Sequence, residues 1–352
     1  TNTEEDNNTL SLATSYTDLA GNAGTAETTA NYAIDTLAPT VSSVAITSAS
    51  GIQNSFVNAG DNVLVTVTFS ENSTVTGTPQ LTLAVGEDNH TADYTSSGSG
   101  ATTKVFTYTI QAGDNDTDGI RIGENALALN SGTIRDAAGN YATNLDHIAV
   151  SDNENYMVDT TPPTVSSVAI TSAEGIQNSF VNAGDNVSVT ATFSERVIVV
   201  SGTPTLTLVV DSTDRAATYA SGSWTSGSGS TPLVFRYTIQ AGDTNDTDGI
   251  SIGENALNPD NITVTDLAGN IADDLTHDSV DHNGNFMVDT TAPTVISFDI
   301  SDDLLTKNET MTVDLVFSEP VCAVAGVNLC AIVFSQGTIV SPTGTLTLNS
   351  VQ

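Results

Sequence analysis

The chain has 352 residues, and its 42 Asp and Glu residues stand against only 7 Lys and Arg, which gives a formal net charge of -35. This balance argues against nucleic acid as a partner and against docking to an anionic membrane, because both need clustered basic side chains. Membrane insertion is not expected either, because no apolar run approaches the length of a transmembrane segment. Disorder is also disfavoured, because 38% of the residues are apolar and they alternate with polar residues as in β-strands.

The chain opens with patterns that recur farther along. Residues 17–22 read TDLAGN and residues 31–35 read NYAID, and close relatives of both appear at 265–270 and 285–289. Residues 1–34 are therefore predicted to be the C-terminal part of a preceding repeat. The first thirty residues are too polar for a signal peptide, which fits an excerpt from the interior of a longer secreted protein.

Two later segments are nearly identical. Residues 40–63 read TVSSVAITSASGIQNSFVNAGDNV, and residues 164–187 differ from them only in having Glu174 where the first copy has Ser50. Phe-Ser-Glu follows at 69–71 and again at 193–195. The extra residues of the second copy fall in turn-like stretches, where a fixed framework tolerates insertions.

A proline-containing linker separates the units, and proline there stiffens the chain and removes a hydrogen-bond donor. It reads DTLAPT at 35–40, DTTPPT at 159–164 and DTTAPT at 289–294. The sequence thus predicts complete repeats at 35–158 and 159–288, followed at 289–352 by the N-terminal part of a further, divergent repeat.

Within a repeat, strand patterns dominate. Apolar and polar residues alternate over 63–69, 81–85 and 105–110, and this period of two is typical of strands with one buried face. Clusters of Gly, Asn, Asp and Ser separate the strands. The predicted fold is all-β: tandem seven-stranded antiparallel sandwiches of immunoglobulin-like (Ig-like) architecture, arranged end to end as a rod.

Strand direction predicts where the acidic residues meet. If successive strands alternate in direction from the linker, then the linker Asp, the Glu of Phe-Ser-Glu and the D-x-A-G-N turn all return to one end of the repeat. The resulting sets are Asp35, Glu71, Asp136 and Asn140; Asp159, Glu195, Asp266 and Asn270; Asp289 and Glu319; and, in the first segment, Asp18 with Asn22.

Carboxylates gathered in this way repel unless a cation neutralises them. Ca²⁺ suits the sets best, because it takes six to eight oxygen ligands from flexible loops. A further acidic loop, GDNDTDG, lies at the opposite end and offers Asp114, Asp116 and Asp118 as ligands. The alternative for each motif is that Asp, Asn and Gly simply form turns, and for the GDNDTDG loop the two interpretations are evenly matched.

Taken together, the DTTAPT linkers, FSE, QAGD…DGI, IGENAL and D-x-AGN resemble the bacterial Ig-like repeats of giant RTX-type and biofilm-associated surface adhesins. This resemblance implies an extracellular stalk at the bacterial surface, whose Ca²⁺ ions stiffen the links between neighbouring repeats. The segment 320–352 departs from the central repeat, so calcium at the third linker, with Asp289 and Glu319, is less well supported.

Other candidate sites have simpler explanations. Trp224, in a Gly/Ser-rich insertion, could stack on a sugar ring or rest on its own sandwich. His277, Asp278, Asp281 and His282 form a dense cluster, but the first repeat matches only the first of them, with His147, so a transition-metal site is not favoured. Cys322 and Cys330 could form a small disulfide loop outside the cell or remain as buried thiols.

No catalytic arrangement stands out, because the paired carboxylates recur at every linker and do not mark one cleft. The leading hypothesis is therefore a non-enzymatic, calcium-stiffened stalk. Two alternatives remain: a self-assembling fibre in which like chains complete one another's sheets, and a glycan-binding module that uses the Trp224 loop.

Overall fold

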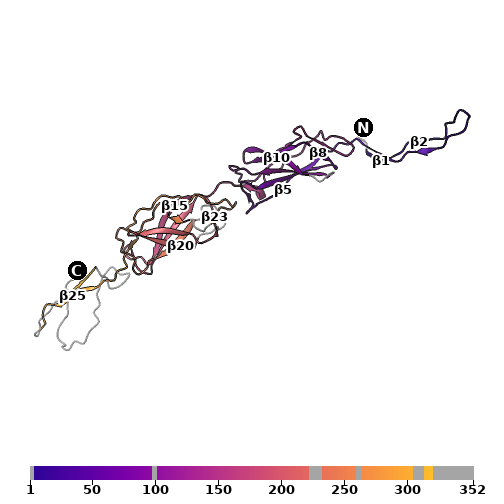
Figure 1. Cartoon of the computed structure of the whole chain (residues 1–352). Helices are drawn as coiled ribbons and strands as arrows, with labels where there is room; N and C mark the ends of the chain where they lie inside the picture. Colours follow the sequence, from indigo (N-terminus) through magenta and orange to yellow (C-terminus); the bar gives the residue numbers. More distant parts are fainter. Residues whose placement is uncertain (1–3, 97–100, 222–231, 259–262, 304–312, 320–352) are drawn as a thin grey trace. The chain divides into compact units, whose positions relative to one another are not determined.

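The computed structural model describes residues 4–96, 101–221, 232–258, 263–303 and 313–319. Within these residues the chain is all-β, as the alternating pattern predicts, and its one helix is the short 3-10 turn η1 (Glu154–Tyr156) (Figure 1). Two compact units are present. The first comprises Thr1–Pro163 with Glu195–Val200 and Thr263–Asp273, and the second comprises Thr164–Ser194, Ser201–Ile262 and Asp274–Gln352.

The first repeat forms a curled, six-stranded antiparallel sheet. Its spatial order is β12-β9-β10-β11-β7-β5, with β5 (Val41–Ala49), β7 (Asn62–Phe69), β9 (Gln80–Val85), β10 (Asp88–Ser96), β11 (Thr103–Thr109) and β12 (Leu127–Ala128). Two short pairs accompany it: β13 (Thr133–Arg135) antiparallel to β8 (Thr74–Thr76), and β14 (Met157–Val158) parallel to β6 (Phe56–Val57). The strands β5, β8 and β10 are labelled in Figure 1.

The core follows directly from the alternation. Every second residue of β7 is buried, from Val63 to Phe69, and these side chains pack with Phe106 of β11 and Leu83 of β9. Burial of each such side chain contributes roughly 1.5–3 kcal/mol. This core gives the first repeat a framework that holds the turns at its ends.

The strand predicted near residues 81–85 is preceded by a separate short strand, β8, which the sequence pattern did not reveal. The division falls between β8 and β9, where Gly77 has a φ of +72° and Pro79 has no N–H to donate to a strand ladder. As a result β8 pairs with β13 and β9 pairs with β10. Within the described residues the first repeat thus has a six-stranded sheet with two short strand pairs, and the predicted seven-stranded arrangement is not confirmed.

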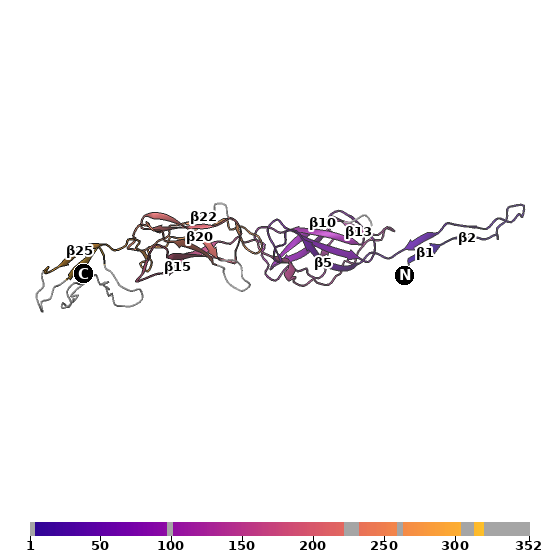
Figure 2. The same cartoon turned by 90° about the horizontal axis from the view of Figure 1, so that it is seen from below.

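The second repeat has the same topology, strand for strand. The six-stranded sheet has the order β15-β17-β21-β20-β19-β22, with β15 (Val165–Glu174), β17 (Asn186–Phe193), β19 (Thr205–Val210), β20 (Thr213–Ser221), β21 (Leu233–Thr238) and β22 (Leu257–Asn258). The pairs are β16 (Phe180–Val181) parallel to β24 (Met287–Val288), and β18 (Ile198–Ser201) with β23 (Thr263–Thr265). Strands β15, β20 and β22 are labelled in Figure 2.

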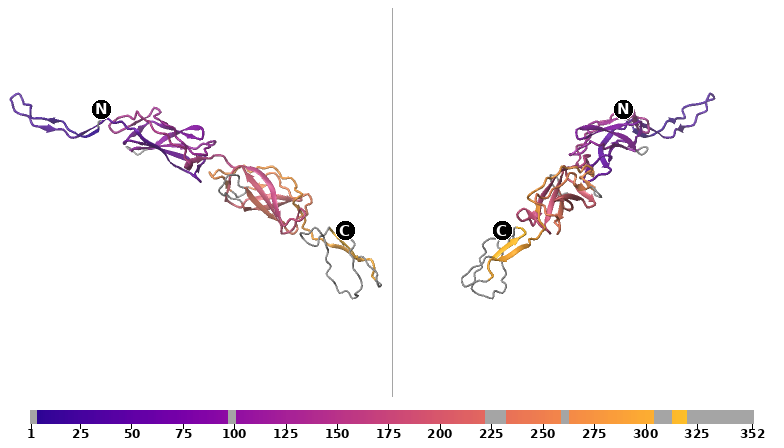
Figure 3. Two further views of the ribbon diagram at one scale, coloured as in Figure 1. Left: turned by 180° about the vertical axis from the view of Figure 1, so that it is seen from behind. Right: turned by 60° about the vertical axis from the view of Figure 1, so that its left-hand side comes forward.

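The flanking segments form strand pairs only. At the N-terminal side β1 (Glu4–Asn8) pairs with β4 (Tyr32–Asp35), and β2 (Ser11–Leu12) pairs with β3 (Glu27–Thr28). After the second repeat, β25 (Val295–Ile300) pairs with β26 (Val313–Phe317). Figure 3 shows these pairs from two further sides. Apolar side chains on them, such as Leu12 and Phe298, are exposed.

Candidate cation sites

The first predicted acidic trio is brought together. Asp35 ends β4, Glu71 lies shortly after β7, and Asp136 directly follows β13. Each offers one carboxylate oxygen, and the three oxygens all lie within 4.8 Å of one another. Two oxygens that each bind one Ca²⁺ ion at about 2.4 Å can lie at most about 4.8 Å apart, so the spacing fits a shared ion. We call this trio site I.

Asn140 organises site I through its backbone and its amide. The Asn140 N–H donates to Asp136 Oδ1 at 2.8 Å, and Asn140 Nδ2 donates to Asp136 Oδ2 at 2.8 Å and to the Asp35 carbonyl at 3.2 Å. Gly139, at φ +102°, also donates its N–H to Asp136 Oδ1. Burial alone would raise the pKa of Asp136, but these hydrogen bonds outweigh it and hold the pKa below its ordinary value.

The second trio, site II, repeats this arrangement with Asp159, Glu195 and Asp266. One oxygen from each again lies within 4.8 Å of the others. Asn270 Nδ2 donates to Asp266 Oδ2 and to the Asp159 carbonyl, both at 2.8 Å. The D-x-A-G-N turn therefore joins the linker to the carboxylate at the end of β23 in the same way as in site I.

Site II carries unrelieved negative charge. Burial, followed by the charges of Asp159 and Asp266, raises the pKa of Glu195 to about 7. The pKa of Asp266 is also raised, chiefly by burial, with a further contribution from Asp159. The Asp266 side chain is buried and those of Asp159 and Glu195 are partly buried, so solvent screens the repulsion less than it would at an open surface. A bound cation or a retained proton would relieve it.

At the third linker, Asp289 and Glu319 lie close enough to interact, and we call them site III. Burial, followed by Asp289, raises the pKa of Glu319. The Glu319 Oε1 atom is buried and has no hydrogen-bond partner. A buried carboxylate oxygen of this kind fits a cation ligand, because leaving it unmatched is costly. Asp289 Oδ1 accepts hydrogen bonds from Asn245 Nδ2 at 2.8 Å and from the Thr291 N–H at 3.0 Å.

In the first segment, the D-x-A-G-N turn is also formed. Asp18 Oδ1 accepts from the Ala20 and Asn22 N–H groups, and Asp18 Oδ2 accepts from Asn22 Nδ2 at 2.7 Å. The Asn22 amide is the main cause of a lowered pKa at Asp18. The turn thus adopts its shape from local hydrogen bonds alone.

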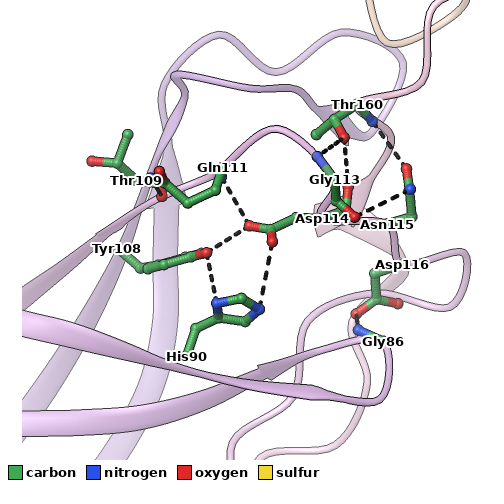
Figure 4. Close-up of polar contacts among 10 residues, drawn as sticks. All are labelled: Gly86, His90, Tyr108, Thr109, Gln111, Gly113, Asp114, Asn115, Asp116 and Thr160. Atoms are coloured by element: carbon green, nitrogen blue, oxygen red, sulfur yellow. Dashed lines mark hydrogen bonds and ion pairs between the residues drawn. The ribbon is translucent and has the colours of Figure 1, made fainter.

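The GDNDTDG loop uses its carboxylates differently (Figure 4). Asp114 Oδ2 accepts from the Tyr108 hydroxyl at 2.5 Å and from the Gln111 N–H at 2.9 Å, while Asp114 Oδ1 lies 3.5 Å from His90 Nε2. In the second repeat Arg215 takes the place of His90, and its Nε donates to Asp243 Oδ1 at 2.7 Å. Asp114 is therefore satisfied by protein donors.

Asp116 and Asp118 differ in their surroundings. Asp116 is buried, and its carboxylate accepts from the Gly86 and Gly119 N–H groups, both at 2.7 Å. Asp118 is exposed. Among the described residues, the groups of three or more His, Cys, Asp or Glu side chains whose ligand atoms lie within 4.8 Å of one another are sites I and II and one further group, Asp246, Asp248 and His282.

This third group divides the histidine cluster noted in the sequence. His282 Nδ1 lies 2.9 Å from the Gly249 carbonyl, and that contact is the main cause of a raised His282 pKa. The His277 ring, in contrast, accepts the Ala256 N–H at Nε2 and contacts the Asp278 carbonyl at Nδ1. Both ring nitrogens of His277 are thus engaged by backbone, as those of His147 are in the first repeat.

The remaining predicted residues, Trp224, Cys322 and Cys330, lie outside the described residues.

A scan against protein-family models finds no match for the chain, and a search of curated proteins finds none either. No helix in the described part of the chain is long and apolar enough to cross a membrane.

Proposed function

We propose that the chain is a segment of an extracellular stalk of a large bacterial surface adhesin. Tandem Ig-like sandwiches form the stalk, and Ca²⁺ at sites I, II and III stiffens the links between them. The stalk would space an adhesive tip from the cell and so support adhesion or biofilm formation. The proposed role of the chain is structural and not enzymatic.

The observation that carries this proposal is the recurrence of one arrangement. Sites I and II each combine the linker Asp with a Glu and an Asp of the repeat that follows it, and each has an Asn that donates to both the linker carbonyl and the second Asp. A catalytic pair would occupy one cleft, whereas a structural ion recurs with the repeat. Calcium is preferred because the ligands are carboxylate oxygens on turns.

Stiffening follows from linkage. An ion that binds the ordered link better than the loose one shifts the equilibrium toward order by its difference in affinity. The linker Asp159 enters site II together with Glu195 and Asp266, so binding restrains the linker against the turn that holds Asp266. Without the ion, repulsion among the three carboxylates opposes that arrangement.

The test is small-angle scattering and thermal unfolding of the chain in Ca²⁺ and in excess chelator. We expect a stiffer, longer particle and a higher midpoint temperature in Ca²⁺, and Glu195→Gln with Asp266→Asn should reduce both effects. Glu254→Gln, at an exposed glutamate outside the three groups, controls for the change in charge. Identical scattering and unfolding in both conditions would sink the proposal.

A further inference from the structure

The linker residue that follows Asp159 is held in a socket formed by the GDNDTDG loop (Figure 4). The Thr160 hydroxyl accepts the Gly113 N–H at 2.9 Å and donates to the Asp114 carbonyl at 3.0 Å. The Thr160 N–H donates to Asn115 Oδ1 at 3.1 Å. Three hydrogen bonds therefore fix a single linker residue, and all of these groups belong to the first compact unit.

The socket is itself braced from within the sheet. The Asp114 carboxylate accepts the Tyr108 hydroxyl, and Tyr108 is buried in β11. The same carboxylate accepts the Gln111 N–H at the start of the loop. These bonds set the direction of the Asp114 carbonyl, which is the group that receives the Thr160 hydroxyl. The acidic loop thus shapes a socket with its carboxylate turned inward.

Asp159 is held on its other side as well. Val158, the residue before it, is buried in β14, which pairs in parallel with β6. The Asp159 N–H donates to the Val57 carbonyl at 3.1 Å. The backbone of Asp159 is therefore fixed both before and after the residue, by parts of the preceding repeat.

The second unit repeats this socket at the next linker. The Thr290 hydroxyl donates to the Asp243 carbonyl at 2.7 Å, and the Thr290 N–H donates to Asn245 Oδ1 at 2.9 Å. Here the loop contains one more residue, Thr244, between the Asp and the Asn. Two of the three contacts thus recur in spite of that insertion, so they do not depend on one loop length.

We propose that Thr160 and Asn115 are positioning residues for site II, because they hold the Asp159 carboxylate in place before an ion arrives. This inference rests on the proposed function, since it assumes that site II binds Ca²⁺. A ligand ordered during folding need not be ordered again on binding, and such preorganisation increases affinity. The affinity of site II would then be set partly by the GDNDTDG loop of the repeat before it.

The test follows the glycine amide signals of the whole ¹⁵N-labelled chain by NMR during Ca²⁺ titration. Gly269 reports on site II and Gly139 on site I, because each lies in the D-x-A-G-N turn of its site. In Thr160→Val, which keeps the shape and removes the hydroxyl, we expect the Gly269 midpoint to rise about fivefold to tenfold. The Gly139 midpoint should not change.

Three variants complete the design. Thr160→Ser keeps the hydroxyl and should restore the wild-type midpoint. Asn115→Ala removes the acceptor of the Thr160 N–H and should therefore also raise the Gly269 midpoint. Thr290→Val removes the matching hydroxyl at the next linker and should leave Gly269 unaffected. Unfolding in chelator is measured for each variant, so that a general loss of stability is seen separately.

The outcomes distinguish a failure of the positioning role from a failure of the cation sites. If Thr160→Val lowers stability in chelator but leaves the Gly269 midpoint unchanged, Thr160 is only structural and the positioning role is wrong. If neither glycine responds to Ca²⁺ in the wild-type chain, the cation sites themselves are wrong, and the positioning role is overturned with them.

Discussion

The carboxyl group of Glu195 shows how strongly the cation sites depend on protonation. It shares site II with Asp159 and Asp266, and its pKa is raised to about 7 by burial and by their charges. As pH rises, the Glu195 carboxyl therefore keeps its proton in the folded chain up to about 7, whereas in the unfolded chain it loses the proton near the ordinary Glu pKa of 4.5. A cation at site II would compete with this proton for the same oxygens.

This competition predicts an unusual dependence of stability on pH. Because the folded-state pKa of Glu195 is the higher one, its contribution to stability is fully present below the unfolded pKa and is lost as pH rises through about 7. In chelator, the stability of wild type relative to Glu195→Gln should thus fall as pH rises from about 5 to about 8. Thermal unfolding of both proteins over this range measures the difference.

The same competition predicts proton release. Near neutral pH, Ca²⁺ binding to site II should displace the Glu195 proton, and calorimetry in two buffers of different ionisation enthalpy would count it. Glu195→Gln should abolish that part of the release. A relative stability that rises with pH in chelator, or binding without proton release, would contradict this description of site II.

At the scale of the elements, the turns depend on glycines with positive φ, but for different reasons. Gly119 has a φ of +99°, and a Cβ there would lie 2.0 Å from the Asn153 carbonyl oxygen. Gly139, in the turn of site I, has a φ of +102° and nothing within 4 Å of an added Cβ. At Gly119 the neighbouring backbone leaves no room for a side chain, whereas at Gly139 only the backbone conformation disfavours one.

These two glycines should therefore respond differently to alanine. Gly139→Ala should cost about 1–2 kcal/mol, because an L-residue is strained in the left-handed conformation. Gly119→Ala should cost about 3 kcal/mol or more, because the backbone at Asn153 must also move. Denaturant unfolding in chelator compares them, and equal losses would show that the contact at Asn153 is easily relieved. Gly249→Ala, with the same clash at Asn283, provides a second measurement.

The elements also show how far the pattern of residues could predict the structure. Period-two alternation located β7, β9 and β11, and strand direction brought Asp35, Glu71 and Asp136 to one end, because both depend on local geometry. The socket around Thr160 could not be found in this way, because Thr160 reaches the Asp114 carbonyl from 46 residues farther along the chain. The pattern also did not show that the Asn140 amide nitrogen donates to Asp136 and to the Asp35 carbonyl.

For the whole molecule, the formal net charge of -35 opposes the compact state through self-repulsion. This repulsion has a diffuse part over the surface and a concentrated part in the partly buried trios of sites I and II. Simple salt screens the first but reaches buried pairs poorly. Calcium at the sites would relieve the second.

Salt and calcium should therefore act in distinguishable ways. In chelator, raising NaCl from about 10 mM to about 1 M shortens the Debye length from about 30 Å to about 3 Å and should raise the midpoint temperature by a few degrees. Micromolar to millimolar Ca²⁺ should add a further increase at high NaCl, and Glu195→Gln with Asp266→Asn should reduce that addition. An effect of Ca²⁺ that vanishes in about 1 M NaCl would mean diffuse screening only.

The socket around Thr160 would have a mechanical role in the proposed stalk, which would bear load. A pull transmitted along the linker from Thr161 meets the three hydrogen bonds of Thr160 before it reaches Asp159, and then meets the Asp159 N–H bond to Val57 and the β14–β6 pair. The hydrogen bonds of Thr160, the Asp159 N–H bond and the β14–β6 pair would therefore be loaded one after another, and the buried Val158 would be loaded last. Under force, the linker would detach stepwise from the first repeat, whose loop and strand β6 hold it.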